Sequence, residues 1–134
     1  MKPLMPCHRG WLVALTLFAA SPSAFAQQAP TDARIAITPF ENISGAPEDT
    51  WIGTGIAETL AAELGGAGFQ VQWGPTPRPV SWQVTGGYQR LGDQLRLTAR
   101  VTDPSSGAVA ASARVDGAMG DLFSLQDDLA GRLL

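Results

Sequence analysis

The feature that most constrains the fold is a period of two that begins at Val80 and runs for almost forty residues, with apolar and polar side chains alternating. Side chains of a β-strand point alternately to opposite faces, so this pattern predicts strands that each bury one face. Residues 91–94 and 103–107 contain the Gly, Asp, Ser and Pro that favour tight turns. The segment therefore predicts a three-stranded antiparallel meander.

The same alternation predicts which side chains face the core. In the second and third strands of the meander the apolar parity is Leu95, Leu97, Ala99 and Val101, then Val109, Ala111, Ala113 and Val115. The other parity of the second strand is polar, as in a sheet with one solvated face; it consists of Arg96, Thr98, Arg100 and Thr102. In the first strand Trp82, Val84 and Tyr88 share a parity, and the pair Gly86 and Gly87 predicts a β-bulge.

A strand, a loop and a helix are predicted before the meander. Residues 34–40 carry isoleucines on one parity and are halted by Pro39, which predicts a first strand. Residues 41–50 are dense in turn formers and predict a loop. A helix is predicted from about residue 49 to residue 64, because apolar residues recur every fourth position, with Gly65 and Gly66 as its carboxyl cap; these are Ile52, Ile56, Leu60 and Leu64.

The remaining segments complete the predicted domain. Residues 69–73 alternate and predict a second strand, and the three prolines of residues 74–79 predict a stiff, extended connection. A closing helix follows Gly120 or Asp121 as its cap, with an apolar stripe formed by Leu122, Leu125, Leu129 and Leu133 together with Phe123. The prediction is one α/β (α+β) domain over residues 34–134, with a single sheet of about five strands and two helices.

The amino-terminal residues have the organisation of a secretory signal peptide. Lys2, His8 and Arg9 precede an apolar run over residues 11–20, and small residues follow it up to Ala26. The apolar run is shorter than the roughly 20 residues of a membrane-spanning helix, although a retained membrane anchor is the alternative. We predict cleavage between Ala26 and Gln27, a flexible tether over residues 27–33, and no transmembrane span after cleavage.

Removal of residues 1–26 changes which chemistry is available. It leaves 108 of 134 residues, takes two of nine basic residues and none of twelve acidic ones, and so moves the net charge from −3 to −5. An acidic chain is a poor ligand for phosphate backbones, so nucleic acid is not an expected partner. The only cysteine, Cys7, and the only histidine, His8, are lost as well. No disulfide, thiolate nucleophile, histidine base or Cys/His metal site is therefore expected.

Carboxylates and one tyrosine, Tyr88, are the remaining candidates for acid–base catalysis. The nearest set lies in the predicted loop and first helix, where capping and solubility explain it; it consists of Glu41, Glu48, Asp49 and Glu58. These residues also lack the alternating spacing of a calcium-binding loop. We predict no catalytic residue, no cofactor and no metal, and the alternative is a secreted hydrolase that acts through carboxylates alone.

Several segments, in order, resemble the TolB-like module. The first is Ile35-Ala-Ile-Thr-Pro-Phe-Glu-Asn42 with Gly55-Ile-Ala-Glu-Thr-Leu60; the hairpin at residues 84–103 and the helix at residues 121–130 follow. The resemblance implies a relationship to the TolB amino-terminal domain and to the FlgO, CsgG and LpoB envelope domains, which are non-enzymatic and act through protein contacts. The family's middle helix is shortened or missing here, since only residues 74–79 stand in its place. One face of the sheet should then be less covered and expose an apolar patch.

Tryptophans bracket the proline-rich connection. The simpler interpretation of Trp73 and Trp82 is packing in the core or at an edge, since large aromatic residues are mostly buried. The alternative is a contact site formed by Trp73, Arg78 and Trp82, because Trp and Arg are enriched at binding hot spots and a stiff loop loses little entropy on docking.

These features predict a periplasmic binding or assembly module of the bacterial envelope, with outer-membrane association possible. Its expected partner is another envelope protein, bound through an exposed sheet face or edge. The alternative is a periplasmic protein that binds small ligands such as glycan fragments, with the tryptophans stacked on sugar rings.

Overall fold

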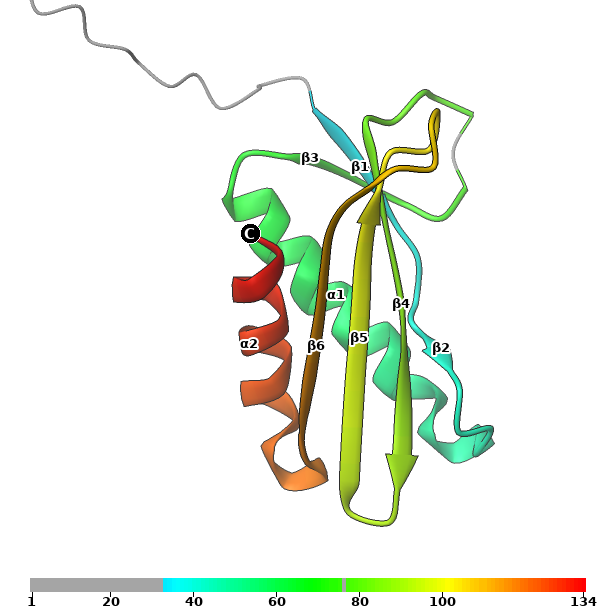
Figure 1. The fold of residues 1–134 in the computed structure, drawn as a ribbon, viewed down its shortest axis with the longest axis vertical. Coiled ribbons are helices and arrows are strands. Elements are labelled where there is room, and N and C mark those ends of the chain that lie inside the picture. Colours follow the sequence, from blue (N-terminus) through cyan, green and yellow to red (C-terminus); the bar gives the residue numbers. More distant parts are fainter. Residues whose placement is uncertain (1–32, 76) are drawn as a thin grey trace, which may run out of the picture.

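The computed structural model describes residues 33–75 and 77–134 (Figure 1). The predicted signal peptide, its cleavage between Ala26 and Gln27, and residues 27–32 of the predicted tether lie outside the described residues. Ala33, the last residue assigned to the tether, is buried, and its carbonyl accepts a hydrogen bond from the amide of Gln70.

One mixed sheet forms the centre of the fold, in the order β3-β1-β4-β5-β6. Its strands are β1 (Arg34–Ile37), β3 (Gln70–Trp73), β4 (Trp82–Leu91), β5 (Gln94–Thr102) and β6 (Val109–Ala118), with β2 (Glu41–Asn42) beside β4. β1 pairs in parallel with β3 and β4, whereas β4, β5 and β6 form an antiparallel meander. The predicted α+β class and the meander are confirmed.

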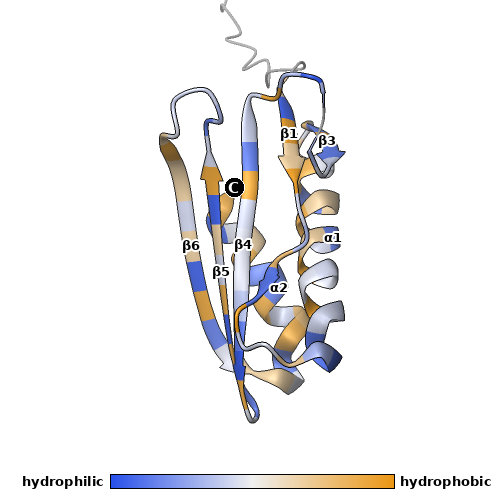
Figure 2. Ribbon diagram, turned by 90° about the vertical axis from the view of Figure 1, so that its right-hand side faces the viewer, coloured by the Kyte–Doolittle hydropathy of each residue, from blue (hydrophilic) through white to orange (hydrophobic). Residues whose placement is uncertain are grey.

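Both helices cover the same face of this sheet, as Figure 2 shows. They are α1 (Thr50–Gly66) and α2 (Leu122–Leu133). Apolar side chains from both helices and from the inner parity of the strands form a single core; its fully buried members include Ile37, Ile52, Ile56, Leu60, Val84, Tyr88, Leu97 and Leu129. Within the described residues, neither helix is long and apolar enough to cross a bilayer.

The end of α1 differs from the prediction. Gly65 and Gly66 continue the helix, and Gly68 is the residue with positive φ, at +97°. The amide of Phe69 bonds to the Leu64 carbonyl, and the amide of Gly68 bonds to the Gly65 carbonyl. This is the pairing of a Schellman cap, in which the left-handed residue lies two positions beyond the last helical residue.

The segment between β1 and α1 is more ordered than the predicted loop over residues 41–50. Glu41 and Asn42 form β2, which pairs in parallel with Gly87 and Tyr88 of β4, and Pro47–Asp49 form one turn of 3-10 helix. The predicted loop therefore contains a short strand, which local sequence did not indicate because the pairing partner of β2 lies more than forty positions away in the sequence.

The predicted bulge at Gly86 and Gly87 is also wrong. The β4–β5 register runs without a break through both glycines, opposite Ala99 and Thr98. A Cβ on Gly86 would lie 2.4 Å from the Phe40 ring and 2.2 Å from the Thr98 carbonyl oxygen, so glycine is needed here for close packing. The irregularity lies in β6 instead, where Ala110 is the extra residue opposite Val101 and Thr102.

Two predicted core positions are exposed for identifiable reasons. The irregularity at Ala110 shifts the parity of β6, so Val109 pairs with Thr102 on the polar side and is 55 % exposed. Phe123 follows the buried Leu122 on α2 but lies outside the buried face of the helix, and its side chain is 79 % exposed. Asp121 does occupy the amino-cap position of α2, but its side chain makes no capping hydrogen bond.

Candidate interaction surfaces

No helix covers the outer face of the meander (Figure 2). We define the outer sheet face as the outward parity of β4, β5 and β6: Gln83, Thr85, Gly87, Gln89, Leu91, Gln94, Arg96, Thr98, Arg100, Thr102, Val109, Ser112, Arg114, Asp116 and Ala118. Most of these side chains are polar or charged. Leu91 and Val109 are exposed apolar members at the ends of their strands, so this face carries no continuous apolar patch, and the expectation of one is wrong for it. The alternation within each strand sets the polarity of this face and keeps it solvated.

Three arginines and one carboxylate give the outer sheet face its charge. Arg96 Nε lies 2.6 Å from Asp116 Oδ1, and Arg114 Nε lies 3.6 Å from Asp116 Oδ2. The hydrogen bond from Arg96 and the charges of Arg96 and Arg114 hold the pKa of Asp116 below its ordinary value. Arg100 is exposed and makes no ion pair with the described residues. The face therefore carries a net charge of +2 on a chain that is acidic as a whole.

An open hollow of about 610 Å³ lies on this face. Ile43 closes one side, because its side chain extends over Gly87, where a Cβ would come within 2.6 Å of it. Thr85, Arg100 and Arg114 also line it, with Glu41 at the margin. The hollow thus combines guanidinium groups, hydroxyls and one half-exposed apolar side chain, which is the mixture typical of protein contact surfaces.

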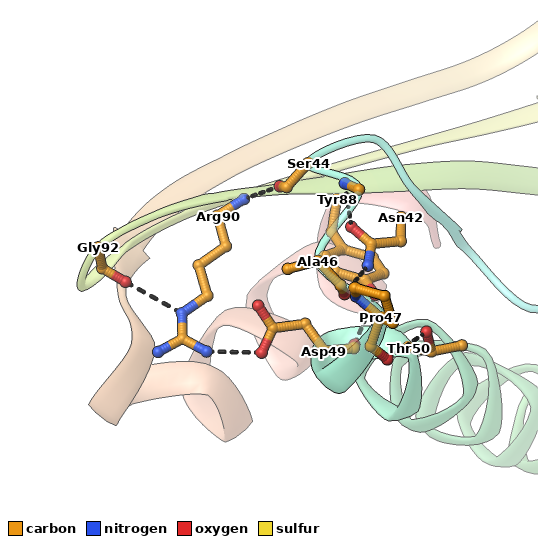
Figure 3. A network of polar contacts seen from close by, with 10 residues as sticks. Asn42, Ser44, Ala46, Pro47, Asp49, Thr50, Tyr88, Arg90 and Gly92 are labelled. Atoms are coloured by element: carbon orange, nitrogen blue, oxygen red, sulfur yellow. Dashed lines mark hydrogen bonds and ion pairs between the residues drawn. The ribbon is translucent and has the colours of Figure 1, made fainter.

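A polar network fixes the loop that borders this hollow (Figure 3). Asn42 donates to the Ala46 carbonyl at 2.6 Å and accepts from the Gly45 amide at 3.1 Å, which closes the loop. The Ser44 hydroxyl accepts from the Arg90 amide, which ties the loop to β4. The Asn of the Pro-Phe-x-Asn motif therefore has a structural role in positioning Ile43 and Ser44.

The carboxylate of Asp49 is part of the same network. Arg90 Nη1 lies 2.6 Å from Asp49 Oδ1, and the Tyr88 hydroxyl donates to the Asp49 carbonyl at 2.5 Å. Asp49 and Tyr88 are both buried, so these contacts satisfy groups that water does not reach. Asp49 thus joins the start of α1 to β4, whereas Glu41, Glu48 and Glu58 are exposed.

The Tyr88 hydroxyl gives a stability prediction. Tyr88→Phe removes the donor to the buried Asp49 carbonyl, and we expect a loss of roughly 1–3 kcal/mol in the free energy of unfolding, measured by urea denaturation at neutral pH. Burial first, and then the charge of Asp49, raise the pKa of Tyr88 above its ordinary value of 10.0. The folded state therefore favours the neutral phenol: its contribution is complete below pH 10 and is lost as the pH rises through the raised pKa. Tyr88→Phe should lack that alkaline loss, and an unchanged alkaline profile would contradict this account.

A second hollow, mainly apolar, lies between the helices and the sheet, with a volume of about 300 Å³. Its walls include Leu60 and Leu64 of α1, Trp82 of β4 and Leu133 of α2, and Glu63 is its only charged lining residue. A sugar would need several hydrogen-bonding groups to replace water around its hydroxyls. This hollow therefore does not favour the glycan-binding alternative.

The predicted contact residues lie around β1. Trp73 pairs with Ile37 on one side of β1 and is 45 % exposed at the end of the edge strand β3. Trp82 pairs with Ile35 on the other side of β1 and is partly buried in the wall of the apolar hollow. Arg78 is exposed in the connection between these strands and lines neither hollow. The structure separates the two tryptophans by one strand, and their role in partner contact stays a prediction.

The described residues contain no group of three or more His, Cys, Asp or Glu side chains arranged to hold a metal ion. An exposed sheet face was expected as a contact surface, but the positive charge of the outer sheet face was not predicted. Arg96 and Arg100 had been assigned to the outward parity, and Arg114 occupies the polar parity of the next strand, so the alternation did contain the signal.

No protein-family model matches the chain. Among curated proteins, one named "Putative adenylate cyclase 3" from Rhizobium meliloti (strain 1021) is 28 % identical over 120 residues, which cover 76 % of this chain. The chain spans only 20 % of the length of that relative.

Solved structures give the clearer likeness. The PelC dodecamer from Paraburkholderia phytofirmans superposes with a TM-score of 0.57 at 18 % identity, over 77 % of this chain and 87 % of PelC. TolB from Acinetobacter baumannii gives 0.56 at 14 %, over 74 % and 26 %, and lipoprotein GNA1162 from Neisseria meningitidis gives 0.55 at 18 %, over 74 % and 96 %. The predicted resemblance to TolB is thus confirmed at the level of the fold.

Proposed function

We propose that this chain is an exported binding or assembly module of the bacterial cell envelope, which acts through protein contacts and not through catalysis. The observation that carries the proposal is the outer sheet face: three arginines on an uncovered sheet, with Arg100 exposed and without an ion-pair partner among the described residues. Arginine is favoured at protein interfaces, since its planar group forms paired hydrogen bonds with carboxylates.

The comparisons support a contact function through the way this fold is used. It makes up most of PelC and GNA1162 but about a quarter of TolB, and the matched part is a fifth of the Rhizobium relative. PelC, one of these neighbours, forms a dodecamer.

The chemistry of the described residues supports the non-catalytic part of the proposal. Tyr88, the only tyrosine, is fully buried with its hydroxyl engaged, and Asp49 is paired with Arg90. The other carboxylates of the loop and first helix are exposed to solvent; they are Glu41, Glu48, Glu58 and Glu63, which lies at the margin of the apolar hollow. An enzyme would need at least one acid or base held in a site that could receive a substrate.

Reversing the charge of an arginine on the outer sheet face tests the proposal. We expect Arg100→Glu to reduce capture of envelope proteins by the tagged, exported chain at least tenfold, because it replaces attraction by like-charge repulsion. Capture would be measured by crosslinking in the native envelope followed by mass spectrometry. Arg132→Glu is the matched control: it makes the same change of charge on α2, at an exposed arginine paired only with Asp128.

The two variants separate a specific surface from a general charge effect. Retained or stronger capture with Arg132→Glu and lost capture with Arg100→Glu would support the proposal. Equal capture by the wild-type chain and by Arg100→Glu, with both folded, would refute a role for the outer sheet face.

A further inference from the structure

The helix side of the molecule has the opposite charge to the outer sheet face. We define the helix layer as residues 47–66 and 119–133, which hold seven carboxylates and one arginine: Glu48, Asp49, Glu58, Glu63, Asp121, Asp127, Asp128 and Arg132. Asp49 and Asp128 are paired with arginines. The other five carboxylates are exposed and make no ion pair with the described residues. Because Arg90 of β4 neutralises Asp49 and Arg132 neutralises Asp128, the surface of the helix layer carries about five uncompensated negative charges.

These two surfaces lie on opposite sides of the same chain, with the core between them (Figure 2). Their charges cannot neutralise one another within one molecule. They can do so between two molecules stacked in the same orientation, with the helix layer of one copy against the outer sheet face of the next. Such a contact is heterologous, so repetition closes a ring or extends a filament.

We propose that the partner of the outer sheet face is the helix layer of a second copy of this chain. The inference rests on the proposed function, because it names the partner of the same surface. It is argued from charge complementarity: the outer sheet face holds Arg96, Arg100 and Arg114 against one carboxylate, and the helix layer is the most acidic surface of the described chain. Opposed layers of helices and sheets are also a common way of covering a sheet.

The size of the face indicates how strong one contact can be. Three strands of about ten residues give a surface about 33 Å long and 14 Å wide, or roughly 450 Å² per partner. Specific interfaces bury about 800 Å² per partner, so a single contact should be weak and dissociate readily. In a closed ring each copy makes two such contacts. A copy leaves the ring only when both contacts break, so the ring is more stable than a single contact.

Salt dependence distinguishes this contact from ordinary behaviour of an acidic chain. A chain with a net charge of −5 repels its own kind, and repulsion between copies should grow as salt is removed. The proposed contact predicts the opposite salt dependence. Attraction between the two oppositely charged surfaces grows as salt is removed, so association should become stronger. We expect association of the purified, exported chain to strengthen at least tenfold between about 500 mM and about 50 mM salt, measured by sedimentation velocity.

A charge exchange between two variants tests the pairing of the surfaces. One variant carries Arg100→Glu with Arg114→Glu, and the other reverses four exposed carboxylates of the helix layer, with Glu58→Arg, Glu63→Arg, Asp121→Arg and Asp127→Arg. Each alone presents like charges on both surfaces and should be at least tenfold weaker in self-association at low salt. Mixed in equal amounts, they present opposite charges again, and association should return to within a few fold of the wild-type chain. Asp93→Arg, at the exposed hairpin tip, changes the net charge without touching either surface and should associate like the wild-type chain.

The outcomes separate this inference from the proposed function. Recovery on mixing supports the second copy as partner, and circular dichroism of each variant checks its fold. A wild-type chain that is monomeric at every salt concentration, or variants that do not recover on mixing, would overturn the inference. The proposed function would still stand if Arg100→Glu lost capture of a different envelope protein, and both would fail if that variant captured as the wild-type chain does.

Discussion

Replacement of Gly86 by alanine should destabilise the protein by roughly 3 kcal/mol or more, which is a large part of the 5–15 kcal/mol typical of a domain. The added Cβ would lie 2.2 Å from the Thr98 carbonyl oxygen and 2.4 Å from the Phe40 ring. The carbonyl belongs to the β4–β5 ladder and cannot retreat without breaking it, and Phe40 is buried in the core. Urea denaturation would show the effect as a lower midpoint with an unchanged slope.

A glycine in open space provides the control for this change. Gly65 lies within α1, and a Cβ there would meet nothing within 4 Å. Gly65→Ala should raise the free energy of unfolding by about 0.5–1 kcal/mol, because alanine favours the helix and restricts the unfolded chain. Equal stability of Gly86→Ala and the wild-type chain would contradict the packing described for β4.

Leu129→Ala should lower the free energy of unfolding by about 2–5 kcal/mol, since it removes a fully buried side chain and leaves a cavity. Leu129 is 0 % exposed and belongs to the core that α2 shares with the sheet. Phe123→Ala on the same helix is the control: Phe123 is 79 % exposed, and its removal should change stability by less than about 0.5 kcal/mol. If Phe123→Ala were as costly as Leu129→Ala, the side of α2 that faces the core would be wrongly assigned.

The elements that the sequence predicts well are those with long, regular periodicity. The meander and both helices follow from repeats of two and of about four residues, because burial of one face imposes those periods directly. The predicted end of α1 and the predicted burial of Phe123 were wrong. Gly65 is compatible with the end or the interior of a helix, and Phe123 is compatible with a buried or an exposed helix position, so the local sequence does not distinguish them. Packing against the rest of the fold decides such cases.

Pairings between distant segments were beyond the reach of local patterns. Glu41 and Asn42 form β2 only because β4 lies beside them, and Gly86 is needed because Phe40 packs on it from another part of the chain. The placement of Trp73 and Trp82 on either side of β1 likewise depends on the strand order. None of these contacts leaves a periodic signature in the sequence.

The expected apolar patch shows how two arguments from the same sequence can disagree. The shortened middle segment implied an uncovered sheet face, and an uncovered face was then expected to be apolar. The alternation that places Arg96, Thr98 and Arg100 outward indicates a polar face, and the structure has that polar face. The residues of the strand itself were the better guide, since the face a strand shows to solvent is set by its own side chains.

A photo-crosslinking residue at Ser112 would report whether the outer sheet face contacts a protein in the envelope. Ser112 is exposed on β6, opposite Arg100 on the outer sheet face. In cells that export the full chain, irradiation should give a covalent adduct with a protein, and mass spectrometry of that adduct should find this chain beginning at Gln27. The account would be contradicted if a crosslinking residue at Ser112 gave no adduct while one at Trp73 did. It would also be contradicted if the crosslinked chain still began at Met1.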